Sequence, residues 1–210
     1  MRSYGQECAL AKALDVVGER WTLLIVRELM IREGCRYTDL RQGLPGIPTN
    51  LLADRLEAME EAGLITKEAA PPPVATNLFR LTLRGRQLEP VVAALGRWGA
   101  PLLEERHGKD AFCDHWIALP LRLYVRDHTP DAARVTLALE AGEEKAVMET
   151  VGDGSIEVRS GLAAHPDARI AGTPQQILRL LTGKMRLAEA RAQGLRYEGE
   201  SGLLHRFSGK

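Results

Sequence analysis

The residues best suited to chemistry in this chain are polar side chains around one helix and the turn before it, and the chemistry they offer is hydrogen bonding. Pro48 opens this helix and Thr49 and Asn50 follow it, with their side chains predicted to face outward. An amide such as that of Asn50 pairs well with the edge of a base, whereas arginine and lysine bind phosphate oxygens. The pattern predicts contact with double-stranded DNA. We expect base contacts from Thr49, Asn50, Asp54 and Arg55, next to Pro48, and phosphate contacts from Thr38, Arg41, Lys67 and Arg80.

Asp54 has two possible roles on this outward face. Its carboxylate could accept a hydrogen bond from the amino group of a cytosine. It could instead form an ion pair with Arg41 or Arg55 and hold that side chain in place, which is the simpler interpretation. The hairpin that follows carries alanine and proline at its tip, where an arginine would suit the minor groove. Base contacts should therefore rest on the helix.

Hydrophobic spacing predicts the elements that position these side chains. A helix presented across a tight turn and followed by a hairpin is the geometry that enters a major groove. Proline cannot donate to a strand ladder, so Pro71–Pro73 should lie in the connection between two strands. The expected elements are a helix over Leu10–Val17, a helix over Trp21–Leu29, a short helix capped by Thr38 and ending near Gly43, a helix from Pro48 to Gly63 that buries Leu52, Leu56 and Met59, strands Leu64–Glu68 and Leu78–Leu81, and a long helix capped by Thr82 with its apolar face over Leu88–Trp98.

From Asp110 onward the hydrophobic period changes to two, which predicts strands. We expect an α+β fold, in which a winged helix-turn-helix domain over residues 1–108 precedes an α+β domain over residues 112–210. The boundary should fall between Arg106 and Phe112. The expected elements of the second half are strands Leu119–Val125, Val135–Leu139 and Ile156–Val158, a helix opened by Thr173-Pro174 and closed by Gly183, a helix from Leu187 to Gly194, and a strand Leu195–Glu198.

The composition of the chain limits the classes of function that it can have. The formal net charge of the 210 residues is zero, which is only a weak argument against nucleic-acid binding because a groove binder needs a basic patch and not a basic whole. No apolar run reaches the length of a membrane span, and the first residues lack the apolar block of a signal peptide, so we expect a cytoplasmic location without membrane insertion. The histidines and cysteines lack zinc spacing, and the serines lack a nucleophile-elbow context. The sequence therefore predicts no enzyme, no metal and no cofactor.

The first hundred residues carry motifs, in order, that resemble HxlR-type winged helix-turn-helix regulators. The resemblance implies a MarR-like protein that binds palindromic DNA as a homodimer, acts as a repressor or activator, and dimerises through its first and last helices. The wide apolar face of Leu88–Trp98 favours a partner helix, although the same face could pack on the second domain. Pro48 stands where the family often has a serine cap. The motifs are Cys8–Ile25, Leu44-Pro45-Gly46-Ile47, Arg55-Leu56, Gly63-Leu64-Ile65, Leu81-Thr82, Gly85, Pro90-Val91 and Arg97-Trp98-Gly99.

Cys8 is a candidate redox residue. Some regulators of this type resemble redox or electrophile sensors that use a cysteine at this position. Cys8 precedes the first expected helix, where backbone N–H groups would favour a thiolate. The alternative is a small, partly buried residue without special reactivity.

The second half resembles the C-terminal part of sterol carrier protein-like domains, through Pro166–Pro174, Ile177–Gly183 and Ala188–Glu200. The resemblance implies a small apolar ligand held between the sheet and its helices, near Leu178, Leu181, Met185 and Leu187. These residues could equally form an ordinary core, because an apolar stripe does not distinguish a filled core from a cavity. The favoured interpretation is a dimeric DNA-binding regulator with a sensing or interaction domain. A lipid carrier whose winged domain mainly dimerises, or a second half that only adds dimer contacts, remains open.

Overall fold

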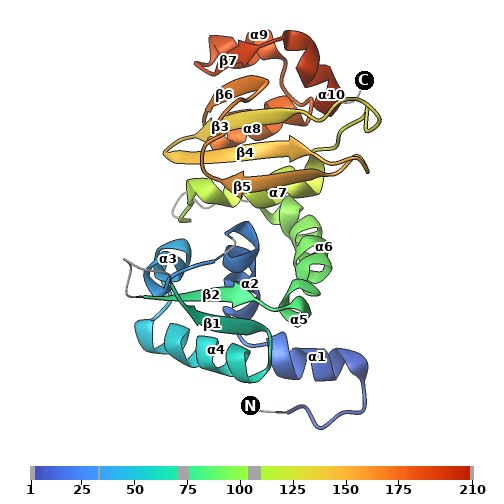
Figure 1. The fold of residues 1–210 in the computed structure, drawn as a ribbon. Helices are drawn as coiled ribbons and strands as arrows, with labels where there is room; N and C mark the ends of the chain where they lie inside the picture. The colour runs from blue at the N-terminus through green and yellow to red at the C-terminus, as the bar shows by residue number, and fades with distance from the viewer. Residues whose placement is uncertain (1–2, 33, 71–75, 104–109, 209–210) are drawn as a thin grey trace. The chain divides into compact units, whose positions relative to one another are not determined.

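The computed structural model describes residues 3–32, 34–70, 76–103 and 110–208, and it divides into two compact units (Figure 1). The first unit comprises Met1–Ala111 and the second Phe112–Lys210. Each unit buries its own set of apolar side chains.

The first unit is a helix-turn-helix followed by a two-stranded wing. β1 and β2 pair antiparallel, with Ile65 opposite Leu81, and Cys35 adds an isolated bridge to Phe79. This arrangement confirms the winged helix-turn-helix expected from the sequence. The described elements are α1 (Ala9–Val17), α2 (Thr22–Ile31), α3 (Tyr37–Gly43), α4 (Thr49–Glu61), β1 (Ile65–Ala69), β2 (Asn77–Leu81), α5 (Leu83–Arg86), α6 (Glu89–Gly99) and the 3-10 turn η1 (Ala100–Leu103).

Helix α4 has the amphipathic pattern that its spacing predicts. Leu52, Leu56 and Met59 are buried, because residues three and four apart share one face of a helix. Gly63 follows the last turn with φ at 67°, a left-handed conformation that glycine adopts without strain. The helix therefore ends where the glycine was expected to stop it.

Two expectations about the helices were wrong, one about a cap and one about a length. Thr38 lies inside α3 and does not cap it; the Asp39 carboxylate instead accepts the backbone N–H of Arg36 at 2.8 Å. Thr82 does accept the N–H of Gly85, but the helix that it caps is only the short α5. The expected long helix is broken after Arg86, and Pro90 lies in the first turn of the separate helix α6, a position that needs no N–H.

The second unit is a five-stranded mixed sheet with helices packed on it. Its strand order is β5-β4-β3-β6-β7, in which β3 and β6 are parallel and the other neighbours antiparallel. This mixed helix and strand content agrees with the expected α+β class. The described elements are η2 (Asp114–Ile117), α7 (Ala118–Tyr124), β3 (Thr136–Ala141), β4 (Glu144–Thr150), β5 (Ile156–Ser160), β6 (Ala168–Gly172), α8 (Pro174–Leu181), α9 (Leu187–Ala192), β7 (Arg196–Gly199), η3 (Ser201–Leu204) and α10 (His205–Ser208).

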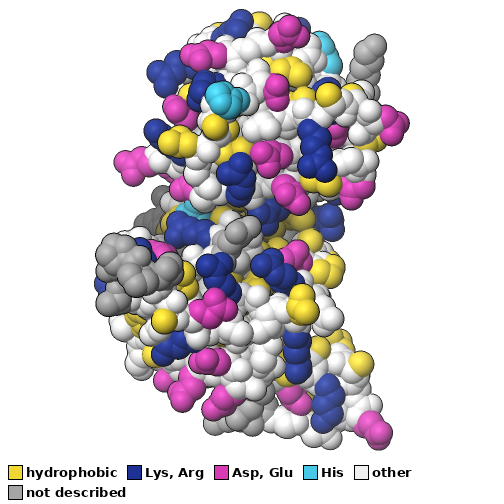
Figure 2. Space-filling view, viewed as in Figure 1, with side chains coloured by type: hydrophobic (Ala, Val, Ile, Leu, Met, Phe, Trp, Pro, Cys, Tyr) yellow, Lys and Arg dark blue, Asp and Glu magenta, His cyan; other side chains and the backbone are white. Residues whose placement is uncertain are grey.

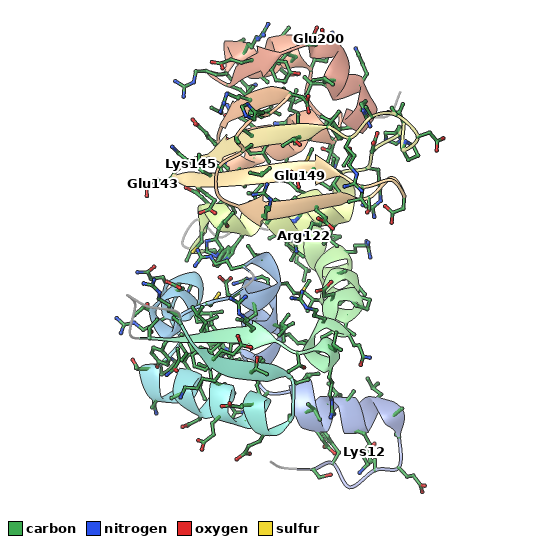
Figure 3. The ribbon with its side chains drawn as sticks, viewed as in Figure 1. Lys12, Arg122, Glu143, Lys145, Glu149 and Glu200 are labelled. Atoms are coloured by element: carbon green, nitrogen blue, oxygen red, sulfur yellow. The ribbon has the colours of Figure 1, made fainter. Side chains whose placement is uncertain are left out.

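Alternation along the strands gives this sheet one apolar face and one charged face. Leu137, Met148 and Ile170 are buried on the face against which helices such as α8 pack. Charged residues of both signs point the other way, and Figure 2 shows blue and magenta side chains interspersed over this unit. At the edge of the sheet, Arg122 of α7 donates to the Val158 carbonyl of β5 (Figure 3). An edge strand covered in this way offers fewer free groups for further pairing.

One expected strand of the second unit was wrong. Residues Leu119–Val125 form most of α7 and its end rather than a strand. The buried side chains are Ala118, Leu121 and Val125, which are three and four residues apart. The apparent period of two came from Leu119 and Leu123, whose side chains are only half-buried. The expectations for α8 and α9 were correct, including the Thr173 cap.

Candidate nucleic-acid interface

Three of the predicted base-contacting residues of α4 are exposed. Asn50 and Asp54 lie on the side opposite the buried stripe, whereas Thr49, three residues before Leu52, is exposed because it begins the helix. Asn50 and Asp54 are four residues apart, so their side chains are neighbours on the helix surface. An amide and a carboxylate at this spacing can donate to and accept from adjacent base edges.

Several contacts fix the turn before α4. Ile47 donates its N–H to the Leu44 carbonyl at 3.1 Å, and Gly46 has φ at 86°. Pro48 is the N-cap residue, and proline carries no side-chain acceptor for the free N–H groups of the first turn. The Tyr37 hydroxyl donates to the Thr49 carbonyl at 2.7 Å and so connects the start of α3 to the start of α4. Sequence reasoning did not select Tyr37.

A buried carboxylate holds α3 against α2. Glu28 is completely buried and pairs with Arg27, whose Nη2 lies 2.7 Å from Glu28 Oε1. The same Arg27 nitrogen donates to the Gly43 carbonyl at 3.1 Å. A Cβ at Gly43 would overlap Glu28 Oε2, so a side chain there requires the buried Glu28 carboxylate to shift. The exposed Thr38 and Arg41 are presented by this fixed helix.

Arg55 lies apart from the other base-contact candidates. Its side chain is 22% exposed, and Nη1 lies 3.7 Å from a Glu19 carboxylate oxygen. Its Nε is buried and has no hydrogen-bond partner among the described residues. The sequence suggested Asp54 as a partner of Arg55, but the carboxylate that pairs with Arg55 is that of Glu19. A base contact from Arg55 would require that pair to open.

The wing places Lys67 and Arg80 on opposite faces. Lys67 pairs with Phe79 in the ladder, whereas Arg80 pairs with Thr66 one position away, and successive side chains of a strand alternate. Lys67 is exposed. Arg80 Nε lies 3.5 Å from Glu68, so this arginine is already partly neutralised. The alanine and proline tip of the wing extends into residues 71–75, which lie outside the described residues.

The cysteines differ in environment. Cys8 is exposed at the N-terminus of α1, and the N–H groups of Ala11 and Leu10 lower the pKa of its thiol. Cys35 is buried, which raises the pKa of its thiol to about 12. Cys113 is half-buried. Because the thiolate is the nucleophile, Cys8 has the environment that favours reaction with oxidants and electrophiles.

Helices α1 and α6 carry exposed apolar side chains. Leu10 is 67% exposed, Leu95 48% and Trp98 75%. Leu14 and Val91 on the same two helices are also exposed. Apolar side chains that gather on the first and last helices of a domain are typical of a surface that another chain covers.

The four predicted ligand residues of the second unit are not equivalent. Leu181 and Met185 are buried, whereas Leu178 and Leu187 are half-buried. A hollow of about 270 Å³ lies elsewhere and is lined by none of the four. Its lining is Glu140, Gly142, Ala171, Gly172, Gly194 and Arg196.

The described ranges hold neither a candidate metal site nor a candidate membrane span. No group of three or more histidine, cysteine, aspartate or glutamate side chains there is placed to hold a metal ion. No helix within those ranges is long and apolar enough to cross a membrane.

The first unit is similar to known helix-turn-helix transcriptional regulators. Residues 16–107 match the HxlR-like helix-turn-helix family. The chain is 33% identical over 102 residues to the uncharacterized HTH-type transcriptional regulator sll1512 of Synechocystis sp., covering 48% of this chain and 74% of that protein. It is 33% identical over 96 residues to the uncharacterized HTH-type transcriptional regulator YtfH of Escherichia coli, covering 45% of this chain and 75% of that protein. Among solved structures, the redox regulator HypR in its reduced form is 27% identical, with a TM-score of 0.42, covering 47% of this chain and all of that chain.

Proposed function

This chain belongs to the HxlR-like helix-turn-helix family and is a DNA-binding regulator, and from this premise we propose that it binds one double-stranded operator sequence as a homodimer. The observation that carries the proposal is the exposed polar surface of α4 beyond a fixed turn, where Asn50 and Asp54 share one face and Thr49 lies at the helix start. Base contacts come from this face, and phosphate contacts come from Thr38, Arg41 and Lys67. Such a protein acts in the cytoplasm, where the chromosome is.

The two groups of residues have different tasks. Asn50 reads a base edge, so its loss weakens binding to the operator more than binding to other DNA. Arg41 neutralises a phosphate, so its loss weakens binding to all sequences and flattens the salt dependence. Arg55 and Arg80 contribute less than the sequence alone suggests, because Glu19 and Glu68 already pair with them.

The experiment is fluorescence-anisotropy titration of the full chain against a duplex that it selects from a randomised library. A random duplex is the control, and both are measured over a salt series. We expect Asn50→Ala to lose about five- to 150-fold in operator affinity, equivalent to about 1–3 kcal/mol, and much less on random DNA. Arg41→Ala should lose affinity for both duplexes alike. If the library yields no preferred sequence, or if both variants behave identically on both duplexes, the proposal fails.

The homodimer is proposed to form through α1 and α6. The support is the exposure of Leu10, Leu95 and Trp98 on these two helices. A two-fold dimer presents two copies of α4 to two half-sites of a palindrome about one helical turn of DNA apart. Whether the regulator represses or activates depends on where its operator lies relative to the promoter.

For the second unit we propose a role in sensing or interaction. The half-buried Leu178 and Leu187 support an apolar ligand at the helical cover of the sheet, while the buried Leu181 and Met185 support an ordinary core. A ligand regulates only if it binds one DNA-binding state better than the other. Titration with a fluorescent fatty acid, with and without operator DNA, tests this. Saturable binding that leaves DNA affinity unchanged would favour the carrier alternative.

A second route of control is proposed for Cys8. Its exposure and its lowered thiol pKa support oxidation or alkylation at the start of α1, a helix of the proposed dimer surface. A modification there would change DNA affinity through the dimer. Operator titrations before and after treatment with diamide, with Cys8→Ser as the control, decide whether it does.

A further inference from the structure

We propose that Tyr37 is a positioning residue for DNA recognition, which sets the first turn of α4 through its hydroxyl. This inference rests on the function proposed above. Tyr37 is the first residue of α3, and its hydroxyl donates to the Thr49 carbonyl at 2.7 Å. Thr49 is the first residue of α4 and precedes Asn50, so the bond ends beside the proposed base-reading side chains.

The bond matters because no side chain caps the start of α4. An N-cap side chain that accepts a first-turn N–H stabilises the start of a helix. Pro48 occupies the N-cap position and has no such acceptor. The described backbone bond closest to this end is that from the Leu52 N–H to the Pro48 carbonyl at 3.0 Å. The Tyr37 hydroxyl does not replace a cap, since it donates to a carbonyl, but it restrains the same turn.

Tyr37 can restrain α4 because hydrogen bonds fix both ends of its own helix, α3. At its start, Asp39 accepts the Arg36 N–H at 2.8 Å. At its end, Arg27 donates to the Gly43 carbonyl at 3.1 Å, with the buried Glu28 packed against that glycine. The bond from the Tyr37 hydroxyl to the Thr49 carbonyl thus connects the first turn of α4 to a helix that other contacts hold in place. Loss of the hydroxyl frees that turn without removing a DNA contact.

The first test compares Tyr37→Phe with the unchanged protein on the duplex selected by the unchanged protein and on a random duplex. A hydrogen bond worth about 0.5–1.5 kcal/mol corresponds to about two- to tenfold in affinity. We expect the ratio of operator to random affinity to fall about five- to tenfold. The matched control is Tyr197→Phe, which removes a hydroxyl that donates to the Glu200 carbonyl at 2.7 Å in the second unit. That control should leave the ratio within about twofold.

The second test asks whether Tyr37 and the missing cap act on the same turn. Pro48→Ser adds a side-chain acceptor at the N-cap, so the effect of Tyr37→Phe should be smaller in the Pro48→Ser background than in the unchanged chain. Equal effects in both backgrounds would show that Tyr37 does not act through the helix start, and would overturn the inference.

The third measurement separates this inference from the proposed function, because it needs no DNA. Amide hydrogen exchange of the full chain should be at least about threefold faster at Leu52 in Tyr37→Phe, with β1 unchanged. Unchanged exchange at Leu52 overturns the inference even if the protein binds its operator. An unchanged operator-to-random ratio in Tyr37→Phe, in a protein that discriminates, also overturns it. If the unchanged protein selects no sequence at all, the proposed function fails and the recognition role of Tyr37 fails with it.

Discussion

Arg206, in the last described helix, forms an ion pair with Asp127, which lies 79 residues earlier in the chain. Arg206 Nε and Nη2 lie 3.2 Å and 2.5 Å from the two carboxylate oxygens of Asp127, so the pair is bidentate. The side chain of Asp127 is 1% exposed and that of Arg206 is 13% exposed. Arg206 Nη1 also donates to the Ala133 carbonyl at 2.7 Å. One guanidinium therefore fastens α10 to the segment that precedes β3.

Removing one partner of this pair should destabilise the second unit. Arg206→Met keeps much of the apolar length of the side chain but leaves the Asp127 carboxylate buried without its partner. Loss of one member of a buried ion pair typically costs about 3–5 kcal/mol, and we expect about 3 kcal/mol here. Urea unfolding followed by circular dichroism measures the change. Arg159→Met, which breaks an exposed pair with Glu149, is the control and should cost less than about 1 kcal/mol. Equal costs for the two variants would contradict the assignment.

The same pair should make the second unit less stable as the pH falls into the acid range. Burial alone would raise the pKa of Asp127, but hydrogen bonds from Arg206 and Thr129 outweigh it and hold the pKa of that carboxyl below its ordinary value. A carboxyl with a lowered folded-state pKa contributes stability that is fully present above its unfolded pKa of about 3.9 and is lost as the pH falls through the folded value. The urea midpoint of the unchanged protein should therefore fall between about pH 5 and pH 2. In Arg206→Met this fall should be smaller.

Gly43→Ala should destabilise the first unit. A Cβ at Gly43 would overlap the buried Glu28 carboxylate, which Arg27 pairs with, so either this side chain or α3 must shift. We expect a cost of about 1–3 kcal/mol from overpacking. Gly99→Ala is the matched control, because Gly99 also ends a helix and its added methyl meets no atom within 4 Å. A Gly43→Ala protein as stable as Gly99→Ala would rule out the close packing of Glu28 on α3.

Cys8 should react with iodoacetamide faster than Cys35 over the neutral range. The N–H groups of Ala11 and Leu10 lower the pKa of the exposed Cys8 thiol, and burial raises the pKa of Cys35 to about 12. The rate at Cys8 should therefore rise to its plateau at a lower pH than that of a free cysteine. Mass spectrometry of peptides from the alkylated protein gives the rate at each site. A Cys8 rate equal to that of N-acetylcysteine across the whole pH range would remove the basis for sensing at this residue.

Trp98→Asp should dissociate the proposed dimer. Trp98 is 75% exposed on α6, and a buried tryptophan is often the residue on which an interface depends most. A loss of at least about 2 kcal/mol corresponds to about a thirtyfold increase in the dimer dissociation constant. Sedimentation equilibrium measures it, and Leu162→Asp, an exposed leucine of the second unit, is the control. If both variants dissociate at the same concentration as the unchanged protein, α6 does not form the interface.

Local residue patterns were sufficient to predict much of this fold. The stripe of Leu52, Leu56 and Met59 and the positive-φ Gly63 define α4, because helical spacing and glycine at a helix end are local properties. The Thr173 cap and the glycine after α9 follow from equally local chemistry. The shared exposed face of Asn50 and Asp54 also follows from local spacing, because residues four apart are neighbours on a helix. The strand predicted over Leu119–Val125 failed because a leucine-rich run fits both periods, and only packing against β5 decides which residues are buried.

The tertiary structure alone decided which residues distant in sequence come into contact. The sequence showed that Arg55 and Arg80 carry charge near the recognition helix, but the fold pairs them with Glu19 and Glu68. It showed a proline at the start of α4, but only the approach of α3 brings the Tyr37 hydroxyl to the Thr49 carbonyl. Helical and strand periods depend on neighbours a few residues apart, whereas a side chain's partner depends on how whole elements pack. The helix-turn-helix was therefore predictable from local patterns, whereas the pairing of Arg55 and Arg80 with carboxylates was decided by packing.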